Sequence, residues 1–274
     1  MRPALAWTRT PYYVLTGGLA ILFLFPLVWS AVASVGPLPG SGQPVGYGFG
    51  NYSTLFEFQA GLATFFMNSL TISVLTVAFT LGVSILGGYA FARFTFPGKN
   101  ALFLITLAIL MVPSATLLIP LYVMLRQLGL GNSLVGVALV LAVYQLPFAT
   151  FMMRISFEAI PRELEESALV DGAGTFAVLR RILVPLVRPG VITVGLFAFL
   201  AAWNDYFAPL ILISDPAKQP LPLAIAVLRQ QQMGIIDFGA TEAGVVVMAV
   251  PCLVLFILLQ RYYMRGFMSG AIKG

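Results

Sequence analysis

Apolar runs long enough to cross a lipid bilayer recur along the whole chain, and they constrain its fold more than any other feature. A helix needs about 20 apolar residues to span the hydrocarbon core. Only 9% of the residues are charged, whereas soluble domains carry about 25%. Because hydrocarbon offers no partner to backbone N–H and C=O groups, each run is predicted to be helical. The sequence therefore predicts an all-α integral membrane protein in one domain, residues 1–274, with six transmembrane helices at about 12–35, 64–89, 101–124, 133–153, 188–213 and 241–263.

Basic residues predict the orientation of these helices. Six spans place both termini on one side, and 12 of the 15 Lys and Arg residues lie in or beside the termini and the even-numbered loops. Since Lys and Arg collect on the cytoplasmic side, we expect both termini and the loop 154–188 in the cytoplasm. The basic residues follow the ends of apolar runs, so the net charge of +5 does not indicate nucleic-acid binding. The three remaining basic residues are expected on the external side of the membrane: Arg126, Lys218 and Arg229.

Two longer segments are expected on the external side. Residues 36–63 are rich in Gly and Pro and contain no Lys or Arg, which is typical of a loop with little regular structure. Residues 214–240 form the second external loop, in which Pro residues break any continuous span.

The first apolar run has a second interpretation as a secretory signal. Arg2 and Arg9 precede it, and Ala31-Val32-Ala33 resembles an A-x-A cleavage site. The apolar run is about 22 residues long, however, whereas the apolar part of a signal has 7–15. We therefore favour a first transmembrane helix.

The loop 154–188 carries an ordered motif and five acidic residues. After Pro161, the residues RELEESALV are predicted to form a short helix, and Asp171 and Gly172 supply the turn that ends it, since Gly adopts the left-handed conformation that other residues resist. The motif consists of Glu166-Ser167-Ala168, then Gly172 after three residues, Ile182 after nine more, and Val184-Pro185. A solvated loop of mixed charge needs no such spacing, so the motif favours a docking helix.

No catalytic apparatus is visible in the sequence. The chain has no His, and its single Cys252 lies in an apolar run, which argues against zinc, haem and disulfide sites. Gly98-Lys99 is the only Gly-Lys pair, and Arg93 stands where the first glycine of a phosphate-binding loop would be. We therefore expect this chain to bind no cofactor or metal.

Ionisable groups inside membrane spans are functional candidates because they are expensive to bury in lipid. In the fifth run, Trp203, Asn204, Asp205 and Tyr206 follow one another. The polar pair either lines a substrate path or makes structural hydrogen bonds, and the aromatic pair either stacks on a sugar or anchors at the membrane interface. In the third and fourth runs, kinks around a cavity or purely structural kinks are expected at Pro113, Pro120 and Pro147.

With these residues in view, the chain resembles the permeases of ABC importers of the carbohydrate-uptake class, especially the subunit type represented by the maltose transporter's G subunit. The motif of the loop 154–188 matches the spacing of the family's ATPase-coupling loop, with Ser167 and Val184 as small departures. Other landmarks lie along the chain: Asn51-Tyr52, Asn68-Ser69-Leu70, Ala90-Phe91-Ala92-Arg93-Phe94, Trp203-Asn204-Asp205 and the ending Gly270-Ala271-Ile272-Lys273-Gly274.

The resemblance implies a translocation subunit of an ATP-driven sugar importer in a bacterial or archaeal cytoplasmic membrane. Its partners would be a second homologous permease, two ATPase subunits that bind ATP and Mg²⁺, an extracytoplasmic solute-binding protein and membrane lipid. It implies that Glu166, Ser167, Ala168, Asp171, Gly172, Ile182 and Pro185 couple this chain to the ATPase, and that residues 214–240 contact the binding protein.

Two other classes of protein are alternatives to a subunit of an ATP-driven importer. An ion-coupled secondary transporter would move its substrate without ATP, and such a protein would need more intramembrane acids and bases than this chain offers. An intramembrane enzyme would need a reactive group of residues that the sequence does not contain.

Overall fold

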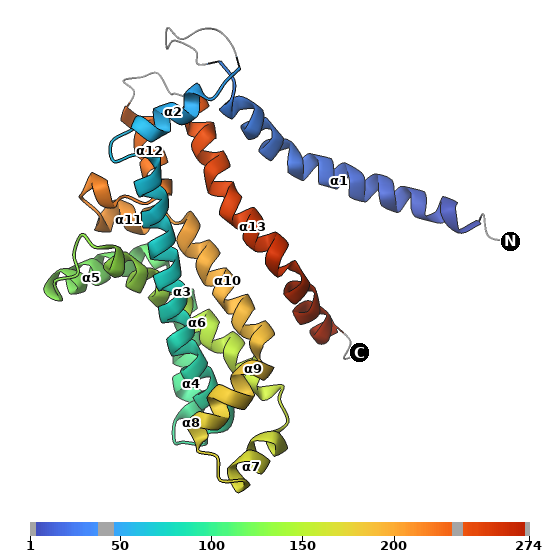
Figure 1. Cartoon of the computed structure of the whole chain (residues 1–274). Coiled ribbons are helices and arrows are strands. Elements are labelled where there is room, and N and C mark those ends of the chain that lie inside the picture. Colours follow the sequence, from blue (N-terminus) through green and yellow to red (C-terminus); the bar gives the residue numbers. More distant parts are fainter. Residues whose placement is uncertain (1–3, 38–46, 232–237, 272–274) are drawn as a thin grey trace. The chain divides into compact units, whose positions relative to one another are not determined.

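The computed structural model describes residues 4–37, 47–231 and 238–271, and all the elements within them are helical (Figure 1). Parts of both predicted external loops, 38–46 and 232–237, lie outside the described residues, as does Ile272-Lys273-Gly274 of the C-terminal landmark. The longer helices are α1 (Ala4–Ser34), α3 (Leu62–Arg93), α5 (Ser114–Gln127), α6 (Leu134–Glu158), α10 (Arg188–Asn204), α12 (Leu221–Gln231) and α13 (Phe238–Ala271). The shorter ones are α2 (Gly50–Glu57), α4 (Lys99–Ala108), η1 (Ile109–Met111), α7 (Arg162–Val170), α8 (Thr175–Val178), η2 (Leu179–Leu183), α9 (Val184–Leu186), α11 (Phe207–Leu212) and η3 (Pro216–Lys218).

Four of these helices are long and apolar enough to cross a membrane: Pro11–Ser34, Leu62–Arg93, Leu134–Glu158 and Phe238–Gln260. Two bent helix pairs bring the number to six if each pair is one span. The all-α membrane fold predicted from the sequence is therefore confirmed. The side on which the termini lie, and the count of six, stay predictions.

The predicted third span is bent, as its prolines led us to expect, and a second bend lies just before the predicted fifth span. Lys99–Met111 and Ser114–Gln127 meet at 104°, directly at Pro113. Thr175–Leu186 and Arg188–Asn204 meet at 79°, just after Pro185. Proline lacks the backbone N–H and its ring collides with the preceding turn. Pro120 and Pro147, in contrast, lie inside α5 and α6, which continue through them.

The described residues form two compact units. In the unit of residues 1–62 and 225–251, α2 replaces the irregular loop that the sequence predicts. The buried Asn51 Nδ2 donates hydrogen bonds to the carbonyl oxygens of Ser34 at 2.8 Å and Gly36 at 3.1 Å. A Cβ atom at Gly239 would overlap the Asn51 amide. These contacts hold the end of α1 against α2, and they depend on positions far apart in the sequence.

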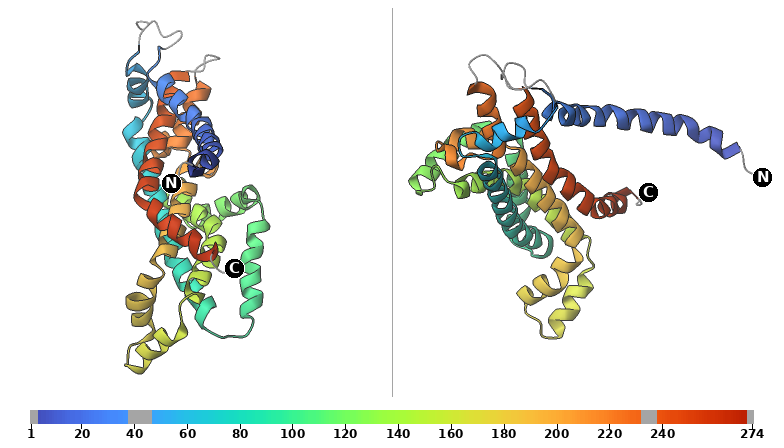
Figure 2. Two further views of the ribbon diagram at one scale, coloured as in Figure 1. Left: turned by 90° about the vertical axis from the view of Figure 1, so that its right-hand side faces the viewer. Right: turned by 45° about the horizontal axis from the view of Figure 1, so that its top comes forward.

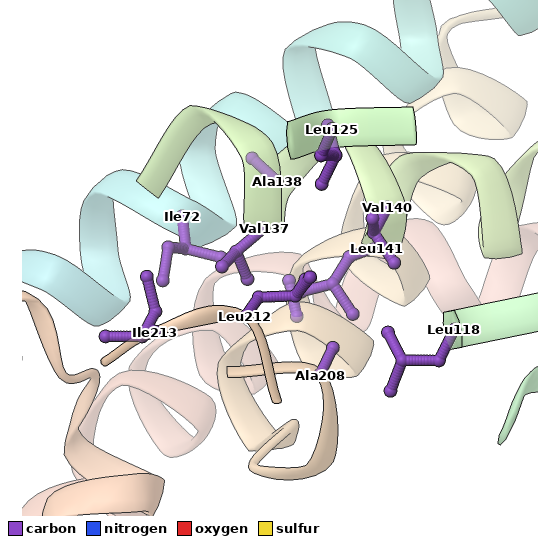
Figure 3. Close-up of a cluster of buried hydrophobic side chains, with 11 residues drawn as sticks. Ile72, Leu118, Leu125, Val137, Ala138, Val140, Leu141, Ala208, Leu212 and Ile213 are labelled. Carbon is purple, nitrogen blue, oxygen red and sulfur yellow. The ribbon is translucent and has the colours of Figure 1, made fainter. Parts of the chain in front are cut away.

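The unit of residues 63–224 and 252–274 contains α3 to α11, and its long helices α3, α6 and α10 run beside one another (Figures 1 and 2). Figure 3 shows one of its two apolar clusters, in which α6 contributes the centre and α3, α5 and α11 surround it. The members drawn there include Ile72, Leu118, Val137, Leu141, Leu212 and Ile213. The second cluster gathers Tyr89 and Ala92 of α3, Met153 and Phe157 of α6, and Val178, Leu179, Leu183 and Val187 of the bent segment.

Small residues let α3 approach α6 closely. Ser69, Ser73, Thr76, Thr80 and Ser84 are all buried along one face of α3. Thr76 Oγ1 donates a hydrogen bond to the carbonyl of Ala138 in α6 at 3.3 Å. Farther along, Gly88 faces Met153 so tightly that a Cβ atom would lie 2.9 Å from the backbone nitrogen of Arg154. Close approach of this kind is how helices associate in lipid, where the hydrophobic effect between them is absent.

Gly88→Ala is expected to lower the Tm of the purified protein because its methyl group meets backbone atoms that no rotamer change can move away. Overpacking of this sort costs roughly 1–3 kcal/mol. Gly82→Ala in the same helix is the matched control, since a Cβ there meets nothing within 4 Å. Thermal unfolding of both variants in detergent measures the effect, and equal Tm values would contradict the close α3–α6 contact.

Candidate functional site

The helix α7 lies at one end of its unit, beside α8 (Figure 1). It begins after Pro161, as predicted, and carries Glu163 and Glu165 in its first turn, where carboxylates interact favourably with the helix dipole. It ends at Asp171, followed by Gly172 with φ of +85°. The predicted short helix and its left-handed glycine are both confirmed.

Two hydrogen bonds close the end of α7. The N–H of Gly172 donates to the carbonyl of Leu169 at 3.1 Å, and that of Ala173 donates to the carbonyl of Ala168 at 3.0 Å. This is the Schellman arrangement, which requires a left-handed residue at the glycine position. A Cβ at Gly172 would meet nothing within 4 Å in this chain. The need for glycine is therefore conformational, as the sequence analysis expected, and it does not arise from a clash with a side chain.

The acidic residue that fastens α7 to the rest of the unit is Glu165. Tyr89 Oη donates a hydrogen bond to Glu165 Oε1 at 2.5 Å, and Arg93 Nε forms an ion pair with Glu165 Oε2 at 3.1 Å. Arg93 Nη2 also donates to the carbonyl of Ile160 at 2.9 Å, just before α7 begins. The side chains of Arg93 and Glu165 are only 5% and 12% exposed. A buried carboxylate thus joins α7 to the last turn of α3.

The face of α7 that bears Glu166 is turned outward. Glu166, Ser167 and Asp171 are exposed, and they are accompanied by apolar side chains that none of the described residues covers. Val170 is 87% exposed and Phe176, in the next helix, is 68% exposed. Exposed apolar residues gathered among charged ones are typical of a protein–protein contact. The local geometry suits a docking element that is held from one side and free on the other.

The remaining residues of the motif serve the packing of the bent segment. Ile182 lies against the second apolar cluster, and Ala168 and Ala173 pack against the same cluster. Pro185 is exposed and directly follows the π-helical turn η2. Pro185 lies inside the short helix α9, and the bend of 79° follows that helix before Arg188. The motif therefore defines both the docking helix and the bend that follows it.

The four polar and aromatic residues of the fifth run take different positions. Trp203 is fully buried between Phe66, whose ring centroid lies at 5.4 Å, and Phe199, at 5.7 Å. Asn204 is exposed and donates to the carbonyl of Leu200 at 2.8 Å.

Asp205 Oδ1 accepts a hydrogen bond from the N–H of Ala208 at 2.9 Å and so begins α11. Tyr206 is 48% exposed. The burial of Trp203 and the local bonds of Asn204 and Asp205 agree with structural roles for these three. A substrate path along Asn204, Asp205 and Tyr206 stays a prediction.

Sequence reasoning overlooked Tyr89 and Glu165, and it gave Arg93 no role beyond orientation. A signal was nevertheless present, because Tyr89 and Arg93 are four residues apart at the end of a long apolar run. That spacing places both on one face of a helix, so they were candidates to share one carboxylate partner.

A helical membrane protein that presents an outward-facing helix held by a buried ion pair has the architecture of a transport subunit that engages a partner. The family of binding-protein-dependent transport system inner membrane components matches residues 84–265, which include α7 and the whole motif. The chain belongs to this family of transport permeases, and it is a multi-pass membrane protein.

Several characterised permeases are similar over most of the chain. The diacetylchitobiose uptake system permease protein NgcG of Streptomyces coelicolor is 31% identical over 259 residues, which are 93% of this chain and 85% of that protein. The trehalose transport system permease protein SugB of Mycobacterium tuberculosis is 32% identical over 274 residues, which are 97% of this chain and 98% of that protein. Among solved structures, a chain of the bacterial ABC transporter involved in alginate import aligns with a TM-score of 0.78 at 22% identity. That alignment covers 96% of this chain and 99% of the other, and it shows the same fold.

Glu165→Ala is expected to release α7, because removal of one partner from a buried ion pair costs roughly 3–5 kcal/mol. Hydrogen exchange of the amides from 163 to 173 should become much faster, while α6 and α10 keep their protection. Glu163→Ala, an exposed carboxylate of the same turn, is the control and should change stability by at most about 1 kcal/mol. Unchanged protection in Glu165→Ala would show that other contacts hold α7.

Proposed function

We propose that this chain is the translocation subunit of an ATP-driven ABC importer for a sugar or a sugar derivative. The observation that carries the proposal is α7 itself, which is fixed through Glu165 on one side and exposes Glu166, Val170 and the nearby Phe176 on the other. In this role the exposed face contacts a separate ATPase subunit, which binds ATP and Mg²⁺. Movement of that subunit then moves the spans to which α7 is attached.

The relatives support a carbohydrate substrate. Their names refer to diacetylchitobiose, to trehalose and, for the SmoH permease of Agrobacterium fabrum at 33% identity, to sulfoquinovosyl glycerol. These compounds share a glycosidic framework but differ in size and charge. The proposal therefore extends to the class of sugars and sugar derivatives.

The proposed assembly contains a second homologous permease, two ATPase subunits and an extracytoplasmic solute-binding protein. Within its unit, α1 has an 18-residue apolar window in Pro11–Ser34 in which no residue is buried, and in the proposed assembly lipid or another subunit covers this window. The proposed location is a bacterial or archaeal cytoplasmic membrane, with both termini and α7 in the cytoplasm. Residues 214–240 then face the binding protein.

A mild detergent purification of the complex from native membranes tests the proposal directly. Identification of every co-purifying chain by mass spectrometry should reveal a second permease, a phosphate-binding-loop ATPase and a solute-binding protein. If the chain purifies alone and still transports in response to an ion gradient without ATP, the proposal is wrong and an ion-coupled secondary transporter takes its place.

Gly172→Val is expected to weaken ATPase binding while the membrane subunits still assemble. Valine at φ of +85° is strained, so the turn that closes α7 is lost and the exposed face changes its orientation. Gly174→Val is the matched control, because Gly174 has φ of −71°, which valine adopts readily. The amount of ATPase that co-purifies with each variant, together with uptake by cells, measures the effect. Full transport by Gly172→Val would remove α7 from the coupling role.

A further inference from the structure

We propose that α3 is a rigid connection that links α7 to residues 214–221, here called the outer segment, at the opposite end of the same unit. The inference rests on the proposed function, and it assigns a task to a helix outside the docking motif. It implies that movement of α7 by the ATPase is transmitted through α3 to the surface expected to face the binding protein.

The α7 end of α3 is held by charge and by hydrogen bonds. Tyr89 and Arg93, one helical turn apart, both contact the Glu165 carboxylate, and Arg93 also binds the carbonyl of Ile160. Tyr89 is anchored in turn, because its ring packs edge-on against Phe157 of α6.

The other end of α3 is held to the outer segment by side-chain to backbone hydrogen bonds. Asn68 Nδ2 donates to the carbonyl of Ala217 at 2.9 Å and to that of Gln219 at 3.0 Å. Ser69 Oγ accepts a hydrogen bond from the N–H of Leu221 at 2.8 Å in a buried position. Figure 1 shows α3 running between these two ends of its unit.

The helix between the two ends is uninterrupted. Asn68 and Tyr89 are 21 positions apart in α3, which corresponds to about 32 Å along the helix at 1.5 Å per residue. Along this length Thr76 donates a hydrogen bond to a carbonyl of α6, and Gly88 lies tightly against Met153, so α3 is held to α6 at two levels. A helix braced in this way transmits an axial or tilting displacement with little loss.

The covalent route from α7 to the outer segment, in contrast, is interrupted several times, first by the turn at Gly172 that closes α7. It passes through the π-helical turn Leu179–Leu183, the bend of 79° before Arg188, and the break at Asp205 and Tyr206 between α10 and α11. Interruptions of this kind absorb displacement by changes in a few dihedral angles. The non-covalent route through α3 is therefore the stiffer of the two.

The outer segment has a second tether that stabilises its shape. Asn132 Oδ1, in the turn before α6, accepts hydrogen bonds from the N–H groups of Ser214 at 3.1 Å and Asp215 at 3.2 Å. Lys218 Nζ donates to the carbonyl of Asn132 at 3.1 Å. The segment is thus held both to α3 and to the turn that leads into α6.

Asn68→Ala and Tyr89→Phe, about 32 Å apart along α3, test the connection in the purified complex in lipid nanodiscs. Each is expected to reduce the stimulation of ATP hydrolysis by the co-purifying binding protein by about fivefold, a typical size for coupling between sites. Unstimulated hydrolysis and co-purification of the ATPase should stay as in the unaltered complex. The effect of a non-hydrolysable ATP analogue on the Kd of the binding protein should fall as well, because both ligands act on the same conformational equilibrium.

The double variant provides the decisive measurement. If α3 is one connection, breaking it at both ends does no more than breaking it at one, so the double variant should equal the more severe single variant. Independent effects of two distant sites would instead multiply, to about 25-fold, and that result would overturn the proposal. Stimulation that survives in both single variants would overturn it as well.

Controls separate this proposal from the proposed function. Gln127→Ala alters an exposed amide at the end of α5, and Tyr12→Phe an exposed tyrosine of α1, so both should keep full stimulation. If Tyr89→Phe fails to assemble, Asn68→Ala alone tests the connection, because stimulation that survives in that variant overturns the proposal. Absence of an ATPase or of any stimulation in the unaltered complex refutes the proposed function itself, and the connection falls with it.

Discussion

The buried carboxylate of Glu165 is the interaction on which the rest of this unit depends. A charge removed from water is strongly destabilised unless it is paired and hydrogen-bonded, and here Arg93 supplies the charge while Tyr89 supplies a donor. A partner bound to a short helix can displace the membrane spans only if that helix is firmly attached to them. The chain connections on either side of α7 are turns, which are poor at transmitting force. The ion pair gives α7 a lateral attachment to a long helix.

The membrane explains why this attachment and the helix contacts beyond it are polar or small. Helices in lipid gain little from burying apolar side chains against each other, because lipid tails are equally apolar. Association then depends on close packing and on hydrogen bonds, and α3 shows both. Its Ser and Thr residues line the contact with α6, Gly88 allows the backbones to meet, and Asn68 and Ser69 bind backbone groups of the outer segment. The same residues in a soluble protein would make a weak core.

Much of the fold was predictable because the dominant signals are local. The apolar runs located the membrane-spanning helices, and Pro161 and Gly172 located the ends of α7, since each acts on its own backbone. Proline was an uncertain guide to bends. Pro113 marks a bend of 104°, whereas Pro147 lies within a helix that continues, because neighbouring helices decide whether the distortion is accommodated. The helix α2 was missed since its position depends on Asn51 binding carbonyl groups of another segment.

The site was less predictable than the fold because it depends on contacts between residues that are far apart in the sequence. The spacing of the motif drew attention to Glu166, and the structure indeed places that residue on the exposed face. Trp203, considered for contact with a sugar, lies buried between two phenylalanines, and sequence alone does not distinguish an aromatic residue that packs from one that binds. Which residues of a helix face inward depends on elements that meet only in the folded chain.

The adjacent acids Glu165 and Glu166 show how α7 combines attachment and docking. Neighbouring residues in a helix point about 100° apart, so two consecutive carboxylates necessarily face different surroundings. Glu165 turns toward α3 and is neutralised by Arg93, while Glu166 turns to the exterior and keeps its charge available to a partner. A single acid could not serve both purposes, because the pairing that holds the helix would consume the charge that a partner needs. In the proposed function the two tasks are divided between consecutive positions, so that the strength of docking can change without loosening the helix from its support.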